Sequence, residues 1–472
     1  MKNHIKLLMT GVLLLVLSAC KVSKDVETPK DATPNTFRFN DASGTASFSV
    51  ANTDWRTFFT DETLQTLIDS ALAKNNDLLV AQQNIEIARL RLGQAKWGNV
   101  PTLNLQVAAS STNPSENSLN GLSLSQFVGQ HHIDDFTTAG SLSWEADIWG
   151  KIRNRKKSAL AQYLQSAEAK NALQTIIVSN VSKGFYNLLM LDSQLEVARK
   201  NLDLNDRTLQ MINLRYDSGQ VTSLAKQQAE AQKLVAAQLI PFLEQQIAIQ
   251  ENALSVLTGS FPKAIDRKSS LAALSVSDKL DAGVPSEMVA TRPDVKASEL
   301  YLQQWNAEVG VAKAQLYPTL TISATGGVNS FEASNWFTMP ASLFGTVAGG
   351  LTQPLLNGKR LKTQYKVAKA EREKAVIGFR QSVLVAVGEV SNALVSIDKL
   401  KLQYEAADGR RLQLEKAVSN ADMLFKSGMA NYLEVITAQD NLLQSELQVL
   451  VQKKARLDAN VDLYRSLGGG WK

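Results

Sequence analysis

Two long stretches of the chain repeat apolar residues at steps of three and four and contain no proline. The first runs over residues 150–217 and the second over residues 358–426. Both are rich in Ala, Leu, Gln, Lys and Glu, which favour helix. We expect two helices of about 65 residues, each roughly 100 Å long at about 1.5 Å per residue. Helices of this length do not fit one globular core, so the pattern predicts lateral packing against other helices.

Each of these helices is expected to end at a Ser-Gly turn, because glycine readily adopts the left-handed conformation that closes a helix. Return helices are expected over 221–258 and 430–467, and Pro241 predicts a local kink in the first of them. The candidate tip residues are Tyr216, Ser218 and Gly219 in the first half and Phe425, Ser427 and Gly428 in the second.

A different pattern, in which apolar residues alternate with polar or small ones, marks two strand pairs near 101–149 and 318–356. Leu103, Leu105 and Val107 are typical members. Each run has about 10 residues, the length of a tilted strand that crosses a bilayer. The connecting segments are a polar loop over 113–135 and a shorter one carrying Phe331 and Trp336, aromatic residues suited to a membrane interface. The same alternation also fits two hairpins on a soluble core.

The number of strands limits how they can sit in lipid. Four strands are too few to close a wide barrel, and bare strand edges are not tolerated in hydrocarbon. If these strands cross a membrane, several copies must share one barrel. Three copies would supply about twelve strands.

The body of the chain is duplicated. Gly93 and the segment starting at Pro101 match Gly310 and the segment starting at Pro318 at a constant offset of 217 residues. Two structural repeats are therefore expected, over about 59–283 and 284–472, within a single protomer that spans 59–472.

The first residues resemble a lipoprotein export signal. Lys2 and Lys6 precede an apolar run over 7–17, which is too short to span a bilayer as a helix. The segment Leu17–Cys20 resembles the bacterial lipobox, so we expect residues 1–19 to be removed and Cys20 to carry lipid. Residues 20–58 would form a tether. Cys20 is the only cysteine, which excludes an internal disulfide.

Charge and motif content argue against nucleic-acid binding and catalysis. Without residues 1–19, which contain two lysines, 48 basic and 45 acidic residues leave a net charge of +3. The cluster from His131 to Asp135 lacks the spacing of a zinc site. Lys359 is followed by Arg360 instead of the Ser or Thr of a phosphate-binding loop. We expect no catalytic residue, cofactor or metal, and we expect residues 468–470 to form a flexible tail.

Several segments together resemble the TolC/OprM family of outer-membrane efflux proteins, in its lipidated, NodT-type branch. The most specific are Val284–Val295, which contains Arg292-Pro293-Asp294, and Ala312–Leu320. Trp144–Lys151 is similar to a further family segment. The resemblance implies a mainly α fold with a small β part. It implies a long α-helical coiled-coil barrel and four strands per protomer, which form a shared 12-stranded barrel in a homotrimer.

The resemblance also implies a function and partners. The protein would be a passive exit duct in the outer membrane for small toxic molecules or drugs. It would contact outer-membrane lipid, a periplasmic adaptor protein and an inner-membrane transporter, with the tips meeting the adaptor. Family members often carry acidic gate rings near the second tip; Glu434 matches one such position, whereas Thr437 and Ala225 occupy others. A solvated helix-face glutamate is the alternative at 434.

Three functions remain open from the sequence. A duct for protein secretion or for metal-ion efflux would share the same architecture. A structural periplasmic coiled-coil lipoprotein is the third, although it has no need for duplicated strand pairs.

Overall fold

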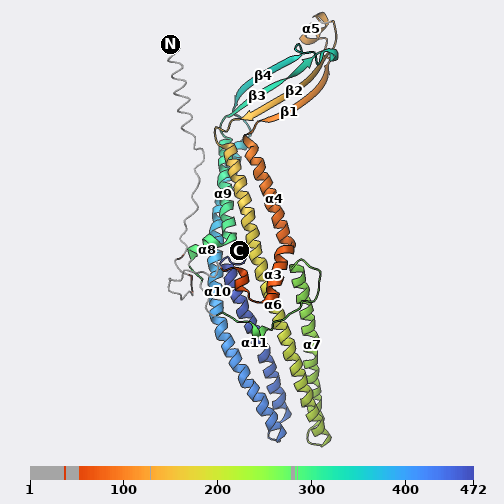
Figure 1. The fold of residues 1–472 in the computed structure, drawn as a ribbon, viewed down its shortest axis with the longest axis vertical. Helices are drawn as coiled ribbons and strands as arrows, with labels where there is room; N and C mark the ends of the chain where they lie inside the picture. The colour runs from red at the N-terminus through yellow and green to blue at the C-terminus, as the bar shows by residue number, and fades with distance from the viewer. Residues whose placement is uncertain (1–33, 35–36, 39–52, 128, 278–281, 284) are drawn as a thin grey trace. The chain divides into compact units, whose positions relative to one another are not determined.

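The computed structural model describes residues 34, 37–38, 53–127, 129–277, 282–283 and 285–472 (Figure 1). Cys20, the expected export signal and most of the expected tether lie outside the described residues. The described chain forms two compact units. We call residues 86–164 and 300–377 the strand unit, and the remaining described residues, within 29–85, 165–299 and 378–472, the hairpin unit.

The strand unit contains one antiparallel sheet in the order β1-β2-β3-β4. Helix α4 leads into β1 and helix α9 leads into β3, while α6 follows β2 and α10 follows β4 (Figure 1). The bounds are α4 Asn76–Lys96, β1 Thr102–Thr112, β2 Ile133–Glu145, α9 Pro293–Ala314, β3 Thr319–Ser330 and β4 Leu343–Thr352, with short 3-10 turns at Trp97–Asn99 and Ala333–Asn335.

The loop expected over 113–135 is shorter than the pattern indicated. It contains a helix, α5 (Leu119–Phe127), and β2 already begins at Ile133. The first residues of β2 pair with the end of β1, from Thr112 opposite Ile133 to Ala109 opposite Phe136. These positions carry Asp and Thr on both faces, so hydrophobic alternation does not reveal them.

The hairpin unit contains most of the two long helices and both return helices. Helices α6 (Lys151–Asp217) and α10 (Arg360–Lys426) each have 67 residues. Helices α7 (Ser223–Leu257) and α11 (Tyr432–Ser466) each have 35 residues, and α7 continues through Pro241. The expectation of a mainly helical, duplicated fold with four antiparallel strands is confirmed. None of the described helices is both long and apolar enough to cross a membrane.

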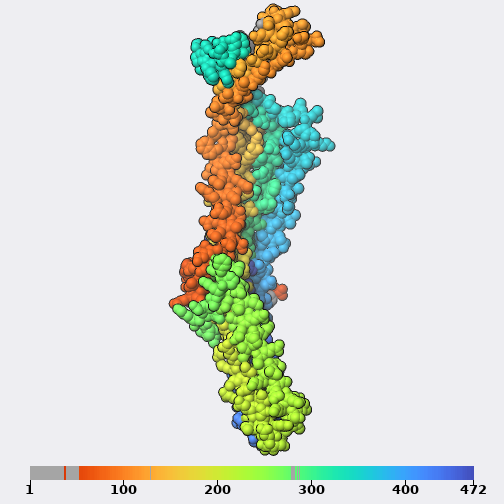
Figure 2. All heavy atoms as spheres, turned by 90° about the vertical axis from the view of Figure 1, so that its right-hand side faces the viewer, coloured from red at the N-terminus to blue at the C-terminus, as the bar shows by residue number. Residues whose placement is uncertain are grey.

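Shorter elements complete the hairpin unit: α2 (Trp55–Phe58), α3 (Glu62–Lys74), α8 (Pro285–Thr291) and a 3-10 turn at Leu271–Ala273. The loop after α7 lies against the end of α3 (Figure 2). Asn75 donates its side-chain amide to the Leu257 carbonyl at 2.9 Å. A Cβ at Gly259 would come within 2.2 Å of the Lys74 carbonyl oxygen, so this close approach requires glycine.

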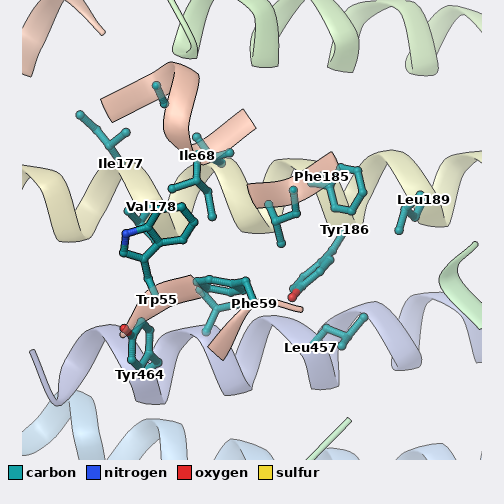
Figure 3. Packing of buried hydrophobic residues seen from close by; sticks show 14 of the residues in the cluster. Trp55, Phe59, Ile68, Ile177, Val178, Phe185, Tyr186, Leu189, Leu457 and Tyr464 are labelled. Carbon is teal, nitrogen blue, oxygen red and sulfur yellow. The ribbon is translucent and has the colours of Figure 1, made fainter. Parts of the chain in front are cut away.

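The largest buried cluster joins α2 and α3 to α6 and α11. Figure 3 shows Trp55 and Phe59 between α6, which contributes Val178 and Phe185, and α11, which contributes Tyr464. Phe58 stacks on the Tyr464 ring with 4.2 Å between ring centroids. Burying a side chain of this size contributes about 1.5–3 kcal/mol, so the cluster fixes the residues that precede α3 on the helices.

The prediction of a flexible glycine tail is wrong. Gly468, Gly469 and Gly470 are all buried. Gly468 and Gly470 have φ values of +92° and +100°, a region that other residues rarely adopt. The Gly469 amide closes α11 by donating to the Tyr464 carbonyl at 2.9 Å. The glycines are needed for tight packing, a reason that composition alone does not reveal.

Replacing Gly469 by alanine is expected to destabilise the protein. The new Cβ would lie 2.3 Å from the Tyr464 ring, and Tyr464 is held in the central cluster. Overpacking of this kind costs about 1–3 kcal/mol, so the thermal melting temperature measured by circular dichroism should fall. Gly409→Ala is the control, because nothing lies within 4 Å of that exposed helical position. Equal melting temperatures for the two variants would contradict the packing argument.

Candidate functional site

One face of the sheet is apolar across all four strands. The register places Leu103 opposite Leu142, Leu142 opposite Ala324 and Ala324 opposite Val347. The face consists mainly of Leu103, Leu105, Val107, Ala109, Phe136, Leu142, Trp144, Leu320, Ile322, Ala324, Val328, Leu343, Val347 and Leu351. Leu105 and Val347 are 78% and 80% exposed, so this apolar surface is uncovered in the protomer.

The opposite face is lined by hydroxyl and amide side chains. Its polar members are Thr102, Asn104, Gln106, Ser110, Thr112, Asp135, Thr137, Ser141, Ser143, Glu145, Thr319, Thr321, Ser323, Thr325, Asn329, Thr346 and Thr352. Only two of these carry charge, and the Glu145 carboxylate pairs with the Lys151 ammonium at 2.6 Å. Such a sheet matches lipid on one face and water on the other.

The two outer strands keep a free edge. In the described sheet β1 pairs only with β2, and β4 only with β3. All ten residues of β4 are exposed, as is nearly all of β1. Their unpaired backbone groups can be satisfied by water or by strands of another chain.

The junction between β2 and α6 is fixed by a short polar and aromatic motif. Asp147 accepts the Ile152 and Arg153 amides at 2.8 and 2.9 Å, which satisfies backbone donors at the start of α6. The Trp149 indole donates to the Pro318 carbonyl at 2.7 Å, and its ring stacks on Tyr317. These contacts tie the first repeat to the second where the strands end.

Both long helices end in the same hydrogen-bonding pattern. Gly219 and Gly428 have φ values of +71° and +78°. The amide of the next residue in each case reaches back to a carbonyl of the last helical turn: Gln220 to Arg215 at 2.8 Å, and Met429 to Leu424 at 2.9 Å. This is the pattern expected where a left-handed glycine terminates a helix.

The candidate tip residues differ in their surroundings. Phe425 is buried with Ile212 and Val435, whereas Tyr216 is exposed under the Lys226 ammonium, 5.5 Å from its ring centroid. Ser218 and Ser427 are exposed and donate to carbonyls of their own helices, Leu214 at 2.8 Å and Leu424 at 3.0 Å. Among the candidate tip residues, Phe425 alone is packed between the two hairpins.

Arg215 joins the two hairpins, and sequence reasoning did not identify it. Its guanidinium donates to the Phe425 and Lys426 carbonyls at 2.6 and 3.2 Å and lies over the Phe425 ring. It therefore caps the end of α10 from α6, with its charge at the negative end of that helix. The duplication offers no signal for it, because the equivalent residue in the second repeat is Leu424.

Glu434 lies in the first turn of α11 and is exposed. Its carboxylate accepts the Asn431 amide at 3.2 Å, while the Asn431 side chain accepts the Leu433 and Glu434 amides. This reciprocal arrangement is a capping box. The side chain thus stabilises the start of α11 whatever its electrostatic role.

The Arg292-Pro293-Asp294 motif forms a buried ionic cluster. The Arg292 guanidinium, with a side chain only 4% exposed, binds Asp294 at 2.5 Å and Glu389 at 2.8 Å. It also donates to the Ser466 carbonyl at 2.8 Å. Burial opposes ionisation of Asp294, but its bonds to Arg292 outweigh this and hold its pKa below the usual range. The motif fixes the start of α9 against α10 and α11.

The histidines of the strand unit do not form a metal site. His131 Nδ1 lies 3.4 Å from Glu116, and His132 Nε2 lies 4.0 Å from Asp134, all on exposed side chains. Within the described ranges, no group of three or more His, Cys, Asp or Glu side chains is arranged to hold a metal ion.

A two-faced sheet joined to long paired helices is the architecture of bacterial outer-membrane export channels. The family model described as outer membrane efflux protein matches residues 67–260 and 284–469. The chain belongs to this family of channels. The interpretation as a non-enzymatic outer-membrane efflux channel that extends into the periplasm is thereby confirmed.

Individual relatives resemble the chain over almost its whole length. The cation efflux system protein CusC of Escherichia coli K12 is 26% identical, covering 97% of both chains. The outer membrane protein OprJ of Pseudomonas aeruginosa is 28% identical, covering 98% of this chain and 95% of OprJ. The open-state crystal structure of the Neisseria gonorrhoeae MtrE outer membrane channel is 25% identical and superposes with a TM-score of 0.85, covering 96% of this chain and 99% of MtrE.

Replacing Arg215 by alanine is expected to loosen the contact between the hairpins. Hydrogen bonds from charged groups contribute about 1.5–3 kcal/mol, so local opening at the end of α10 should become about tenfold more frequent or greater. Hydrogen exchange measured by mass spectrometry on peptides covering 420–434 tests this. Arg207→Ala is the matched control, since the ion pair that Arg207 forms among the described residues lies within α6, with Asp203. Similar exchange in both variants would rule out the role of Arg215.

Proposed function

We propose that the protein is the subunit of a homotrimeric exit duct in a tripartite efflux pump. The observation that carries the proposal is the sheet with one apolar face, one polar face and two free edges. Joining β4 of one copy to β1 of the next pairs both edges. Three copies close a ring of about twelve strands, with the apolar face on lipid and the polar face around water.

The hairpin unit supports the same assembly. Helix α7 carries Val235, Phe242, Ile249 and Val256 at steps of seven residues, each between 53% and 66% exposed. Apolar residues at this spacing form a stripe that packs against a neighbouring helix. A stripe left open in one protomer is expected where copies meet side by side.

The partners follow from the position of the turns. The turns at 216–222 and 425–431 follow the ends of α6 and α10 that are opposite to the ends preceded by β2 and β4. They would meet a periplasmic adaptor protein, which links the duct to an inner-membrane transporter that supplies the energy. Lipid on Cys20 would act as an auxiliary tether beside the strands in the outer membrane.

The proposed cargo is a range of small toxic molecules or drugs. The polar face of the sheet offers hydroxyl and amide groups and little charge, which lets varied solutes pass without tight binding. Metal-ion efflux is the second candidate, because CusC carries the name of a cation efflux system. Protein secretion and a structural rod have no supporting observation of this kind.

The proposed assembly predicts a trimer that conducts ions. Protein purified in detergent should have the mass of three copies by light scattering and should form pores in planar bilayers. A deletion strain should become sensitive to several small toxicants and should recover with the intact gene. A monomer that forms no pores would rule out the duct, while sensitivity to metal ions alone would favour the second candidate.

We also propose that three Glu434 carboxylates form an acidic ring near the periplasmic end. Like charges held close together attract cations and repel one another, so such a ring favours cation entry and a constriction that loosens easily. The capping box alone accounts for the side chain without this ring. The two roles are separable because glutamine also serves in a capping box.

Glu434→Gln is therefore expected to lower cation selectivity and block by divalent cations while leaving α11 intact. Reversal potentials and divalent titrations in planar bilayers measure both effects, and circular dichroism checks the fold. Glu196→Gln is the control, because Glu196 pairs with Lys200 on the exposed side of α6. Unchanged selectivity together with unchanged divalent block would leave Glu434 only its capping role.

A further inference from the structure

The geometry points to Asp135 as the residue that concentrates cations at the outer mouth of the duct. Strand β2 begins at Ile133 and ends at Glu145, where the chain continues into α6. Because the helices lie on the periplasmic side in the proposed assembly, the beginning of β2 lies at the extracellular side. The inference rests on the proposed trimer and adds a specificity-determining residue to it.

Asp135 projects from the polar face of the sheet. It is opposite Ser110 in the register and on the same face as Thr137 and Asn329. Its carboxylate accepts hydrogen bonds from the Asn329 amide and from the Thr137 hydroxyl, the latter at 3.2 Å. Asn329 also donates to the Thr137 oxygen at 2.8 Å. These neutral partners fix the carboxylate without cancelling its charge.

The strands of the described sheet contain no positively charged side chain that could neutralise Asp135. The adjacent Asp134 belongs to the apolar face, because successive strand residues point to opposite sides. Glu145, on the polar face at the other end of β2, is neutralised by Lys151. Within the described residues no Lys, Arg or His side chain forms an ion pair with Asp135.

An open concavity lies beside this carboxylate. It has a volume of about 780 Å³ and is lined by the ends of β1, β2 and β3 together with the segment before β4. Asp135, Asn329, Ser110 and Ser342 contribute to its wall, and the adjacent Asp134 also borders it. Hydrated cations can therefore approach the carboxylate from the water side of the sheet.

Three such carboxylates around one mouth would raise the local cation concentration, most strongly for divalent ions. A concave surface with low-dielectric walls focuses the field of its charges. The range of the field is set by salt: the Debye length is about 30 Å at 0.01 M and about 3 Å at 1 M. Carboxylates spread around a wide mouth therefore act on passing ions in dilute salt and are screened in concentrated salt.

The test compares Asp135→Asn with Glu196→Gln in planar bilayers. Asparagine retains an oxygen that accepts the hydrogen bonds of Asn329 and Thr137, so the strand should stay folded. With dilute salt near 0.01 M on the extracellular side, we expect Asp135→Asn to lower the cation-to-anion permeability ratio about twofold or more. Glu196→Gln removes one carboxylate from the exposed side of α6, where Glu196 pairs with Lys200, and should have a clearly smaller effect. At 1 M salt both variants should match the unmodified protein.

The outcomes separate this inference from the proposed function. Conducting trimers in which the two variants have equal permeability ratios would overturn the role of Asp135 and leave the duct intact. An effect of Asp135→Asn that persists at 1 M salt would also overturn it, because long-range attraction is screened there. If the unmodified protein forms no pores, the duct and the inference fail together.

Discussion

The two outer strands of the described sheet each leave one edge without hydrogen-bond partners, and most of the structure depends on this constraint. Backbone amides and carbonyls without partners cost several kcal/mol each in hydrocarbon, so a four-stranded sheet with free edges is not stable in a membrane as a monomer. The alternation of side chains adds a second constraint. The exposed apolar face around Leu105 requires lipid, whereas the hydroxyl groups on the opposite face of the sheet require water. Both demands are met when copies of the sheet join edge to edge, and the helices that enter and leave the strands must then be arranged around the same axis.

Within the hairpin unit, a small number of polar contacts fix helices that otherwise share only a repetitive apolar pattern. Heptad-like packing leaves sliding and rotation poorly determined, because every turn resembles the next. Arg292 resolves this at the start of α9 by binding Asp294, Glu389 and a carbonyl near the end of α11. Arg215 does the same at the hairpin ends, and a buried hydrogen bond from Gln439 to Thr208 at 2.9 Å lies between α11 and α6. Breaking a buried ionic contact costs more than forming it contributes, which makes such groups effective in selecting one alignment.

The amino-acid sequence predicted the long helices closely, and the reasons are local. Each long helix can be recognised within one stretch of chain, because it lacks proline, is rich in good helix formers and ends at a glycine. The ends of α6 and α10 therefore fell within a residue or two of the expected positions. The start of β2 was missed because its first residues carry Asp and Thr on both faces. The buried glycines after α11 were taken for a tail because the partner that excludes a side chain, Tyr464, is visible only in three dimensions. Arg215 had no sequence signal, whereas the spacing of Asn431 and Glu434 was a recognisable capping pattern. The candidate site is therefore predictable where it depends on periodicity and not where it depends on contacts between distant segments.

The equal lengths of the paired helices limit how this chain can change in evolution. Both outgoing helices have 67 residues and both return helices have 35. Inserting one residue rotates the rest of a helix by about 100° and advances it by about 1.5 Å, which turns its buried stripe toward water. A single-residue insertion in any one helix is therefore not neutral, and only insertions of whole heptads, matched in both members of a hairpin and in both repeats, keep the two turns level. Point substitutions can accumulate freely on the exposed faces, but the length of the hairpins can drift only in coordinated steps.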